Sequence, residues 1–564
     1  MTETEAAPPE PETLRSPPWW LRPVLAVLSG VLIYLSFPPA DIAPLAFVAF
    51  VPLLLAIHDA PCRAALLYGV LAATAAYVPA FAWVSSVAVA GWLGLAVYVG
   101  LYLVAAAVAW RILQAGFPAL WPLFGALLWA GLELFRARLG PGFPWLFMGY
   151  TQYRFGALVQ AAAWGGVYGV SFLVLFVNTA AAAVLRRRLR WFAASGSPAW
   201  PILAAAVGLV ALCASMGAVT RNRLEIRNGP VVGTVQQNIP RIVDEIFRPK
   251  TSEEFYDGME AEVAKAAELT RRLAPRRPRL VVWPETTVGV PLNLAPELFS
   301  VGRERDILED TLDLLRSFGE ELDTYMLVGS PTYFARSAGY VERLAYGTEV
   351  RNFGNSALLF SPEGEFVERY DKIRLVPFGE YIPWREMLPF LQAFTPIGRE
   401  LTPGDKEVIF RLPTREGQTV RFAALICYED VFPDLTASFR RRGADFLVNL
   451  TDEGWYTVPG ELGQHLAMAV FRAVETRTTV VRSANTGVSC FIGPTGEIYA
   501  GLPRQQEGSL AAPVRLCDAV TPYVRSGDAV GVSCLMLSII LPGVLLALRR
   551  RDNLPTAIRE RDSD

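Results

Sequence analysis

The sequence predicts two parts with different folds: a polytopic bundle of membrane-spanning helices, and an α/β domain placed between its last two spans. The chain has 564 residues, which exceeds one ordinary domain. Its composition is 52% hydrophobic and only 19% charged, with a mean hydropathy of +0.31. That balance is typical of a protein with lipid as a solvent. Between about 225 and 520, however, charged and polar residues return.

Apolar runs long enough to cross a bilayer, about 17 to 25 residues each, predict about eight spans. Seven belong to a bundle at 20–222 and one is C-terminal; the runs lie at approximately 21–37, 42–58, 64–84, 88–110, 118–135, 157–185, 200–220 and 527–548. Residues 1–19 are rich in Pro and Glu and predict a disordered cytoplasmic tail. Residues 549–564 are expected to form a second cytoplasmic tail.

Arginines next to the spans indicate the orientation of the chain. Arg186, Arg187, Arg188 and Arg190 follow the sixth run, and three arginines follow the last. The positive-inside rule places both groups in the cytoplasm, and an even number of spans between them agrees. The segment at 225–520 is therefore expected outside the cytoplasm. The exceptions to this pattern are Arg136 and Arg138.

Charge and rare residues exclude several function classes. The net charge of −2 lacks the basic excess of a nucleic-acid binder. The six cysteines form no CxxC pair, so neither a zinc site nor a disulfide framework is expected. We expect no metal and no cofactor. The chain has two histidines, His58 and His465, so most histidine-dependent mechanisms would have to use one of them.

The segment at 225–520 alternates strand-like and helical patterns, which predicts an α/β layered domain. Several strands are apolar throughout and are expected to be buried on both faces. The expected strands are VVGTVQQNI, LVVWPE, YMLVGSPTYF, NSALLFSP, VRFAALICYE, DFLVNL and TVVRSANTGVSCFIG. The expected helices lie at about 252–274, 304–318 and 461–476.

Three polar residues stand at the ends of strand-like runs, where open α/β sheets gather ligands. They are Glu285, Lys372 and Cys427. A carboxylate, an ammonium and a thiol in one pocket would suffice for acyl transfer, because the carboxylate takes the thiol proton and the ammonium stabilises the oxyanion. Each residue has an ordinary alternative: Cys427 as a small core side chain, Glu285 as a cap and Lys372 as a solvated charge.

The motifs around these residues resemble the signatures of the nitrilase superfamily. They are QxN at 236–238, PET at 284–286, DK followed by LVPFGEY at 371–381, and CYE at 427–429. Members of that superfamily use a Glu-Lys-Cys triad on an α-β-β-α sandwich. With membrane spans before and after the domain, nearly the whole chain looks like the apolipoprotein N-acyltransferase family, which performs the last step of bacterial lipoprotein maturation.

The resemblance implies a role for each matching residue. Glu285 would be the general base, Lys372 the oxyanion-stabilising cation and Cys427 the nucleophile. Further substrate-binding or supporting residues of the family fall on Glu380, Tyr428 and Glu429.

The resemblance also implies a ping-pong reaction at the periplasmic face of the inner membrane. Cys427 takes an acyl chain from a phospholipid, typically phosphatidylethanolamine, as a thioester. The α-amine of a diacylglyceryl-cysteine then accepts that chain, which completes the apolipoprotein. We expect the enzyme to be a monomer.

Three positions depart from the family's pattern. Arg374 stands where a His often follows the catalytic Lys, and the stretch often read as SNDAWF appears as TDEGWY at 451–456. A Trp that some members carry after QxNIP is absent, with Phe247 as the nearest aromatic residue.

Other interpretations remain open on the sequence alone. A membrane-tethered amidase or nitrilase could use the same triad on a small C–N substrate, and a receptor or transporter could carry the domain only to bind a ligand. His465 could pair with Cys427, although a single His on an amphipathic helix is more often packed or solvated. Glu133, within an apolar run, is a functional or an interfacial residue. The aromatic loop at 141–152 is hypothesised to dip into the outer leaflet.

Overall fold

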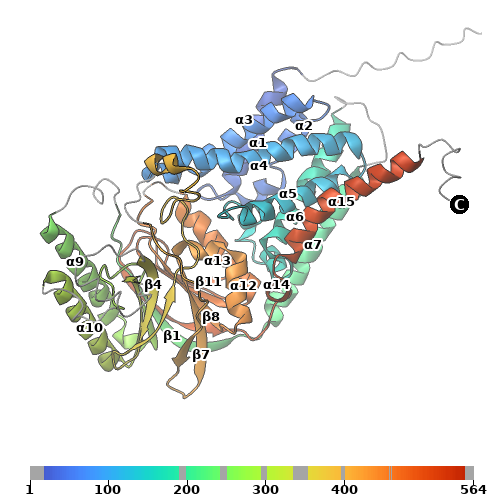
Figure 1. Cartoon of the computed structure of the whole chain (residues 1–564). Coiled ribbons are helices and arrows are strands. Elements are labelled where there is room, and N and C mark those ends of the chain that lie inside the picture. The colour runs from blue at the N-terminus through green and yellow to red at the C-terminus, as the bar shows by residue number, and fades with distance from the viewer. Residues whose placement is uncertain are drawn as a thin grey trace, which may run out of the picture.

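The computed structural model describes residues 18–189, 199–241, 251–293, 302–333, 353–394, 400–456, 458 and 460–552. Most of the expected N-terminal tail, Arg190, Phe247 and the last residues of the C-terminal tail lie outside these ranges. The described chain forms a helical part and an α/β part that pack against each other (Figure 1).

Every run predicted as a span is helical. The helices are α1 (Leu21–Ser36), η1 (Ala43–Phe47) with α2 (Val51–Ala56), α3 (Cys62–Ala80), α4 (Val89–Gly116), α5 (Trp121–Arg138), α6 (Ala162–Arg188), α7 (Trp200–Arg223) and α15 (Ala529–Asp552). Five of them are long and apolar enough to cross a membrane: α3, α4, α6, α7 and α15. The first two runs are shorter, and α5 carries three charged residues near its end.

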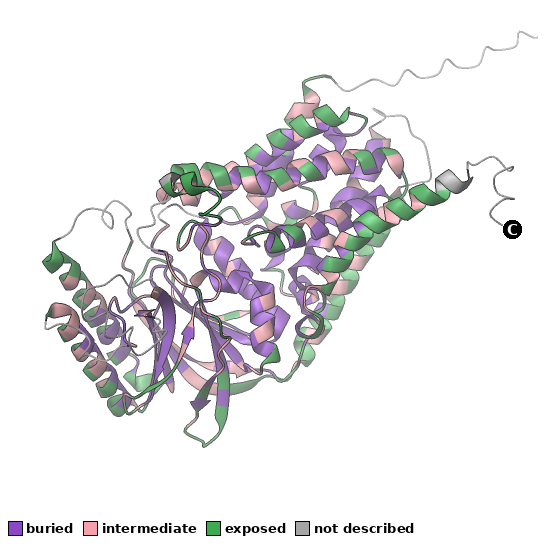
Figure 2. Cartoon of the chain, in the orientation of Figure 1, coloured by how far each residue is buried: buried purple, intermediate pink, exposed green. Residues whose placement is uncertain are grey.

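The apolar helices expose much of their surface. In Figure 2, α7 and α15 are exposed along most of their length. Their exposed side chains include Trp200, Leu212, Ile539 and Leu548. Contiguous apolar surface of this kind is costly in water, so these helices are suited to a lipid environment.

The α/β part consists of two six-stranded sheets with strand orders β12-β1-β2-β3-β4-β5 and β11-β10-β9-β8-β7-β6. Three adjacent strands in the middle of each sheet are parallel, and the outer pairings are antiparallel. The first sheet contains β1 (Arg227–Gln236), β2 (Leu280–Val282), β3 (Tyr325–Tyr333), β4 (Phe353–Phe360), β5 (Phe366–Asp371) and β12 (Gly508–Leu516). The second contains β6 (Phe410–Pro413), β7 (Thr419–Ile426), β8 (Phe446–Thr451), β9 (Thr479–Ala484), β10 (Cys490–Ile492) and β11 (Ile498–Gly501).

Helices cover the outer faces of both sheets, which gives the expected α-β-β-α order of layers. The first sheet packs an apolar core against α9 (Ser252–Arg271) and α10 (Arg303–Leu322). The second lies under α12 (Pro433–Arg441) and α13 (Glu461–Thr476), which stand between the sheets and the bundle in Figure 1. The run expected as one strand at 479–493 is two strands, because a turn separates β9 from β10.

One glutamine attaches α13 to the helical part. The Gln464 side-chain oxygen accepts hydrogen bonds from the indole nitrogens of Trp83 (3.2 Å) and Trp145 (2.7 Å). Its nitrogen donates to the carbonyl oxygens of Pro38 and Ala80, both at 3.1 Å. All of the amide's capacity is thus used by groups that precede the α/β part in the chain.

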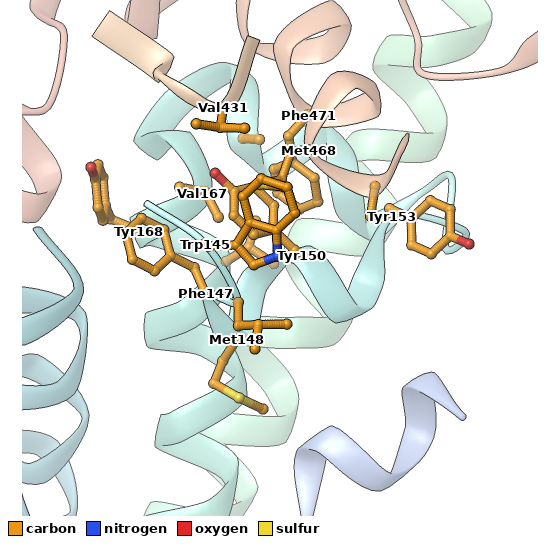
Figure 3. Close-up of a cluster of buried hydrophobic side chains, with 14 of the residues drawn as sticks. Trp145, Phe147, Met148, Tyr150, Tyr153, Val167, Tyr168, Val431, Met468 and Phe471 are labelled. Atoms are coloured by element: carbon orange, nitrogen blue, oxygen red, sulfur yellow. The ribbon is translucent and has the colours of Figure 1, made fainter. Parts of the chain in front are cut away.

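The aromatic loop at 141–152 packs inside this same interface (Figure 3). Phe147, Met148 and Tyr150 are buried, and Phe471 of α13 meets the Tyr150 ring edge-on with 5.2 Å between ring centroids. The hypothesis that the loop dips its side chains into the outer leaflet is therefore wrong for these residues. Their role is to fill the space between the bundle and α13.

Carboxylates and backbone oxygens of neighbouring segments explain the two arginines that break the positive-inside pattern. Arg138, at the end of α5, forms ion pairs with Asp434 of α12, at 2.8 Å, and with Asp528 just before α15. Arg136 is buried and donates to the Trp145 carbonyl oxygen at 2.7 Å. Since one charge is paired and the other is enclosed by protein, these arginines do not report which side of a membrane they occupy.

Replacing Gln464 by Leu should destabilise the whole chain. Two indole N–H groups and two carbonyl oxygens would lose their partner, and each buried polar group left without a hydrogen bond costs about 1–3 kcal/mol. We expect the free energy of unfolding in detergent to fall by about 2–5 kcal/mol, as some groups regain water. Gln418→Leu, in an exposed turn, is the control. It should change the free energy of unfolding by no more than about 0.5 kcal/mol. Equal stability of the two variants would contradict the docking role.

Candidate active site

Glu285 follows β2 after the buried Trp283 and is itself 8% exposed. Its Oε1 accepts hydrogen bonds from Asn355 Nδ2 (2.7 Å) and Lys372 Nζ (3.2 Å), and its Oε2 accepts one from the Asp452 backbone nitrogen (2.9 Å). Burial raises the pKa of Glu285, although the Lys372 charge opposes the rise. A carboxylate with a raised pKa is a stronger base than an ordinary glutamate.

Lys372 directly follows β5, and its backbone nitrogen donates to the Asn355 carbonyl oxygen of the neighbouring strand at 2.9 Å. Its ammonium is almost completely buried and lies between two carboxylates, 3.2 Å from Glu285 and 2.7 Å from Glu380. Burial alone lowers the pKa of a lysine, but these carboxylates and Cys427 raise the pKa of Lys372 well above its usual value. The group is therefore a permanent cation.

Cys427 begins a sharp turn at the end of β7. Its φ of 51° lies in the left-handed region, where a residue with a Cβ is strained. Burial and the negative charge of Glu285 raise the pKa of the Cys427 thiol, while the Lys372 charge lowers it. The resting thiol is thus protonated, and it needs a base at the moment it attacks a carbonyl carbon.

Glu429 joins the segment that carries the lysine to the one that carries the cysteine. Its Oε1 accepts hydrogen bonds from the backbone nitrogens of Ile373 (2.7 Å) and Arg374 (3.0 Å) and from the Tyr370 hydroxyl (2.7 Å). Its Oε2 accepts one from the Ile426 backbone nitrogen at 2.8 Å. Burial raises the pKa of Glu429 to about 7. Glu429 therefore holds the backbone of the two segments that carry Lys372 and Cys427.

The other two supporting residues occupy opposite sides of the site. Glu380 binds the Lys372 ammonium and also accepts a hydrogen bond from the Val376 backbone nitrogen at 2.7 Å, which closes the loop between them. Tyr428 stacks against Phe143 and Trp145 of the aromatic loop, with interplanar angles of 25° and 16°. The nucleophile's neighbour in sequence therefore contacts the helical part.

The structure brings the three candidate catalytic residues together: Lys372 pairs with Glu285 at 3.2 Å, and the charges of both residues act on the Cys427 thiol. His465 is not part of it: its ring nitrogens face Asp430 and Glu453, at 2.5 Å and 2.8 Å, rather than Cys427. Sequence reasoning missed Asn355, which binds Glu285, because an asparagine inside a strand carries no signature. It also missed Asn449, which donates to the Cys427 carbonyl oxygen at 3.3 Å.

The departures from the family's pattern have partners in this chain. Asp452, in the altered stretch at 451–456, forms an ion pair with Arg241 at 2.9 Å, and Arg241 also binds Glu262. Arg374 reaches Asp434 at 3.2 Å and lies over the Phe432 ring. The altered stretch also contacts the site directly, because the Asp452 backbone nitrogen donates to Glu285 at 2.9 Å.

A base, a buried cation and a thiol on an α-β-β-α sandwich define the class of a cysteine-dependent acyl-transferring enzyme, here carried by apolar helices. Comparison with known families agrees. The family described as carbon-nitrogen hydrolase matches residues 235–520, and the apolipoprotein N-acyltransferase N-terminal domain matches residues 29–180.

Curated relatives match over nearly the whole chain. The apolipoprotein N-acyltransferase of Geobacter metallireducens is 36% identical over 542 residues, covering 94% of this chain and 95% of the relative. Those of Chlorobaculum tepidum and Azotobacter vinelandii are each 30% identical and cover 93% and 95% of this chain and 97% and 96% of the relatives. The chain therefore belongs to the apolipoprotein N-acyltransferase family, whose activity requires a lipoprotein substrate and a lipid acyl donor.

Among solved structures, an amidase from Nesterenkonia sp. is similar at 18% sequence identity with a TM-score of 0.35, covering 54% of this chain and 96% of that one. A cysteine-to-alanine mutant of the amidase from Nesterenkonia sp. AN1, in complex with butyramide, is similar at 17% identity with a TM-score of 0.35, covering 54% of this chain and 95% of that one.

The pH dependence of the reaction should follow Glu285. The base must be ionised, so kcat/KM should fall as the pH drops through the raised pKa of Glu285, above the value of about 4.3 for a free glutamate. Glu285→Gln should lower kcat by roughly 10²- to 10⁴-fold, the range of general-base catalysis. Initial rates across pH measure both, with the exposed Glu416→Gln as control. An unchanged rate in Glu285→Gln would remove the base from the mechanism.

Proposed function

We propose that Cys427 accepts the sn-1 acyl chain of a phospholipid, typically phosphatidylethanolamine, and passes it to the α-amine of a diacylglyceryl-cysteine on an apolipoprotein. The observation that carries this proposal is the coupling of Cys427 to both Glu285 and Lys372 in a buried site. The whole-chain similarity to apolipoprotein N-acyltransferases supports the choice of substrates.

In the first half-reaction, the thiol proton passes to the Glu285 carboxylate as the sulfur bonds to the ester carbonyl carbon. The carbonyl oxygen takes the negative charge, which the Lys372 ammonium stabilises. The intermediate then breaks the ester C–O bond, and Glu285 returns the proton to the departing glycerol oxygen. The products are a thioester on Cys427 and a lysophospholipid.

In the second half-reaction, the α-amine of the apolipoprotein attacks the thioester carbon. Glu285 takes a proton from the amine as the amide bond forms. When the C–S bond breaks, Glu285 gives this proton to the departing sulfur, which restores both the Cys427 thiol and the Glu285 carboxylate. Water would compete with the amine for the thioester, so a site from which water is excluded favours transfer over hydrolysis. The buried surroundings of Glu285 and Lys372 support this requirement.

An apolar surface lies beside the site and is suited to lipid entry. Trp384 packs over Gly140, which lies just after the end of α5. The segment at 378–390, which contains Glu380, exposes several large apolar side chains: Phe378, Trp384, Met387 and Phe390. Because acyl chains are transferred favourably onto apolar surface, this segment supports access from a bilayer.

We also propose the division of the chain and its orientation. Residues 20–222 form seven membrane-crossing segments and 527–548 an eighth, with 225–520 as the catalytic domain on the periplasmic side of the inner membrane. Tails at 1–19 and 549–564 are cytoplasmic, and the enzyme acts as a monomer. The arginines after α6 and α15 support this orientation through the positive-inside rule.

Purified enzyme with phosphatidylethanolamine labelled in its sn-1 chain and a diacylglyceryl peptide should produce labelled triacyl peptide. Without the peptide, the label should remain on Cys427 as a hydroxylamine-sensitive thioester. Cys427→Ala should show neither product, whereas Cys490→Ala, a buried cysteine outside the site, should keep the activity if folded. Release of free fatty acid with no peptide acylation would instead indicate a membrane-tethered hydrolase.

Alkaline phosphatase fused into the exposed turn at Gly417, where nothing lies within 4 Å of an added Cβ, tests the orientation. The reporter is active only where its disulfides form, outside the cytoplasm. We expect high activity from this insertion and low activity from a fusion after residue 564. The reverse pattern would place the catalytic domain in the cytoplasm.

A further inference from the structure

A network of buried charged side chains lies next to the nucleophile and takes no part in the mechanism above. Each member is no more than 3% exposed. Asp430 belongs to the turn after β7, Glu453 follows β8, and the others lie on α13 and β9. The members are Asp430, Glu453, Glu461, His465 and Arg482.

His465 is the centre of this network and is an imidazolium. Its Nε2 lies 2.5 Å from Asp430, and its Nδ1 lies 2.8 Å from Glu453 and 3.3 Å from Glu461. Because both ring nitrogens face carboxylates, both carry a proton. Burial lowers the pKa of a histidine, but Asp430 and Glu453 raise the pKa of His465 well above its usual value.

The same residues do not form a metal centre. Glu453, Glu461 and His465 offer ligand atoms within 4.8 Å of one another. However, the Arg482 guanidinium binds both Glu453 and Asp430 at 2.5 Å, and it lies 3.5 Å from His465 Nδ1. A metal ion would meet that fixed positive charge, and it would need the histidine nitrogen that now faces two carboxylates. The network is held together by its own cations.

Asn449 connects this network to the nucleophile. It lies on β8, and its Nδ2 donates both to the Cys427 carbonyl oxygen, at 3.3 Å, and to Asp430 Oδ2. On the other side of the nucleophile, Glu429 holds the Ile426 backbone nitrogen. A left-handed residue with a Cβ persists only where its surroundings hold it. The peptide group that follows Cys427 and the one that precedes Ile426 are fixed in this way.

Helix α13 extends this connection to the helical part. Gln464, which binds Trp83 and Trp145, immediately precedes His465. The Trp145 ring also lies 5.7 Å from the His465 ring, measured between centroids. Consecutive residues of α13 therefore contact the bundle and the network that supports the nucleophile.

We propose that Asn449, Asp430 and His465 are positioning residues that hold Cys427 in its left-handed conformation and so aim its thiol at the acyl donor. None of them touches the reacting atoms. The inference rests on the proposed function only in naming the acyl donor, since the conformation of the turn is a property of the protein itself. Loss of the network should slow thioester formation while leaving lipid binding intact.

The chain offers a matched pair of variants, because His58 is its only other histidine. His58 is also buried and lies near Gln114 and Asp59 in the helical part. His465→Gln should lower kcat for acyl transfer from phosphatidylethanolamine by roughly ten- to hundredfold, the effect of misplacing a reacting group by about 1 Å. The KM should change less than about threefold. His58→Gln should keep both constants near those of the unchanged enzyme.

Asn449→Ala is the second variant, since His465→Gln could also destabilise the fold. It removes the donor to the Cys427 carbonyl oxygen without leaving a buried charge unpaired at position 465, and it should give the same selective loss of kcat. A thermal unfolding transition in detergent verifies that each variant is folded. A folded Asn449→Ala with the kcat of the unchanged enzyme, or a rise in KM alone, would overturn the proposal.

Alkylation of Cys427 by iodoacetamide, followed by mass spectrometry of its peptide, separates this proposal from the proposed function. The reagent needs no lipid, and alkylation should be slower in both variants. If the unchanged enzyme transfers no acyl chain, the proposed function fails, but slower alkylation in the variants still supports positioning. Equal alkylation rates in folded variants contradict positioning whatever the substrate is.

Discussion

The site depends on one buried ammonium group and the two carboxylates that hold it. Lys372 lies between Glu285 and Glu380 with almost no contact with water. A single buried charge of this kind is strongly unfavourable, and breaking such a pair commonly costs about 3–5 kcal/mol. Moving the carboxylates away from the lysine is therefore unfavourable, which keeps Glu285, the proposed general base, beside the cation.

The position of the Cys427 thiol is fixed in a different way, through hydrogen bonds to the backbone around it. Glu429 and Asn449 bind the peptide groups around Cys427, and Glu429 also binds the backbone of the lysine segment. The segments that carry Lys372 and Cys427 thus share a carboxylate that the proposed mechanism does not use. Behind them, α13 packs against both the second sheet and the helical part, so a catalytic turn and the membrane-suited helices belong to one continuous packed core.

Features that depend on local sequence patterns could be predicted from the sequence. Apolar runs located the helices of the helical part and α15. Strand-end motifs located Glu285 and Lys372, which form an ion pair, and Cys427, on which both charges act. Short or polar strands such as β5 and β11 were missed, because exposed residues such as Phe366 and Ile498 obscure their periodicity. Asn355, Gln464 and His465 acquire their roles only from partners far away in the chain. The loop at 141–152 was misjudged because aromatic residues suit a membrane interface and a protein interface equally well.

The central claim is that the Lys372 and Glu285 charges act on the Cys427 thiol. It is tested most directly by the pH profile of Cys427 alkylation by iodoacetamide in the enzyme and two variants. Lys372→Met removes a positive charge and should shift the profile to higher pH. Glu285→Gln removes a negative charge and should shift it to lower pH. Shifts in opposite directions are the predicted result, and profiles that coincide in all three folded proteins would contradict the account.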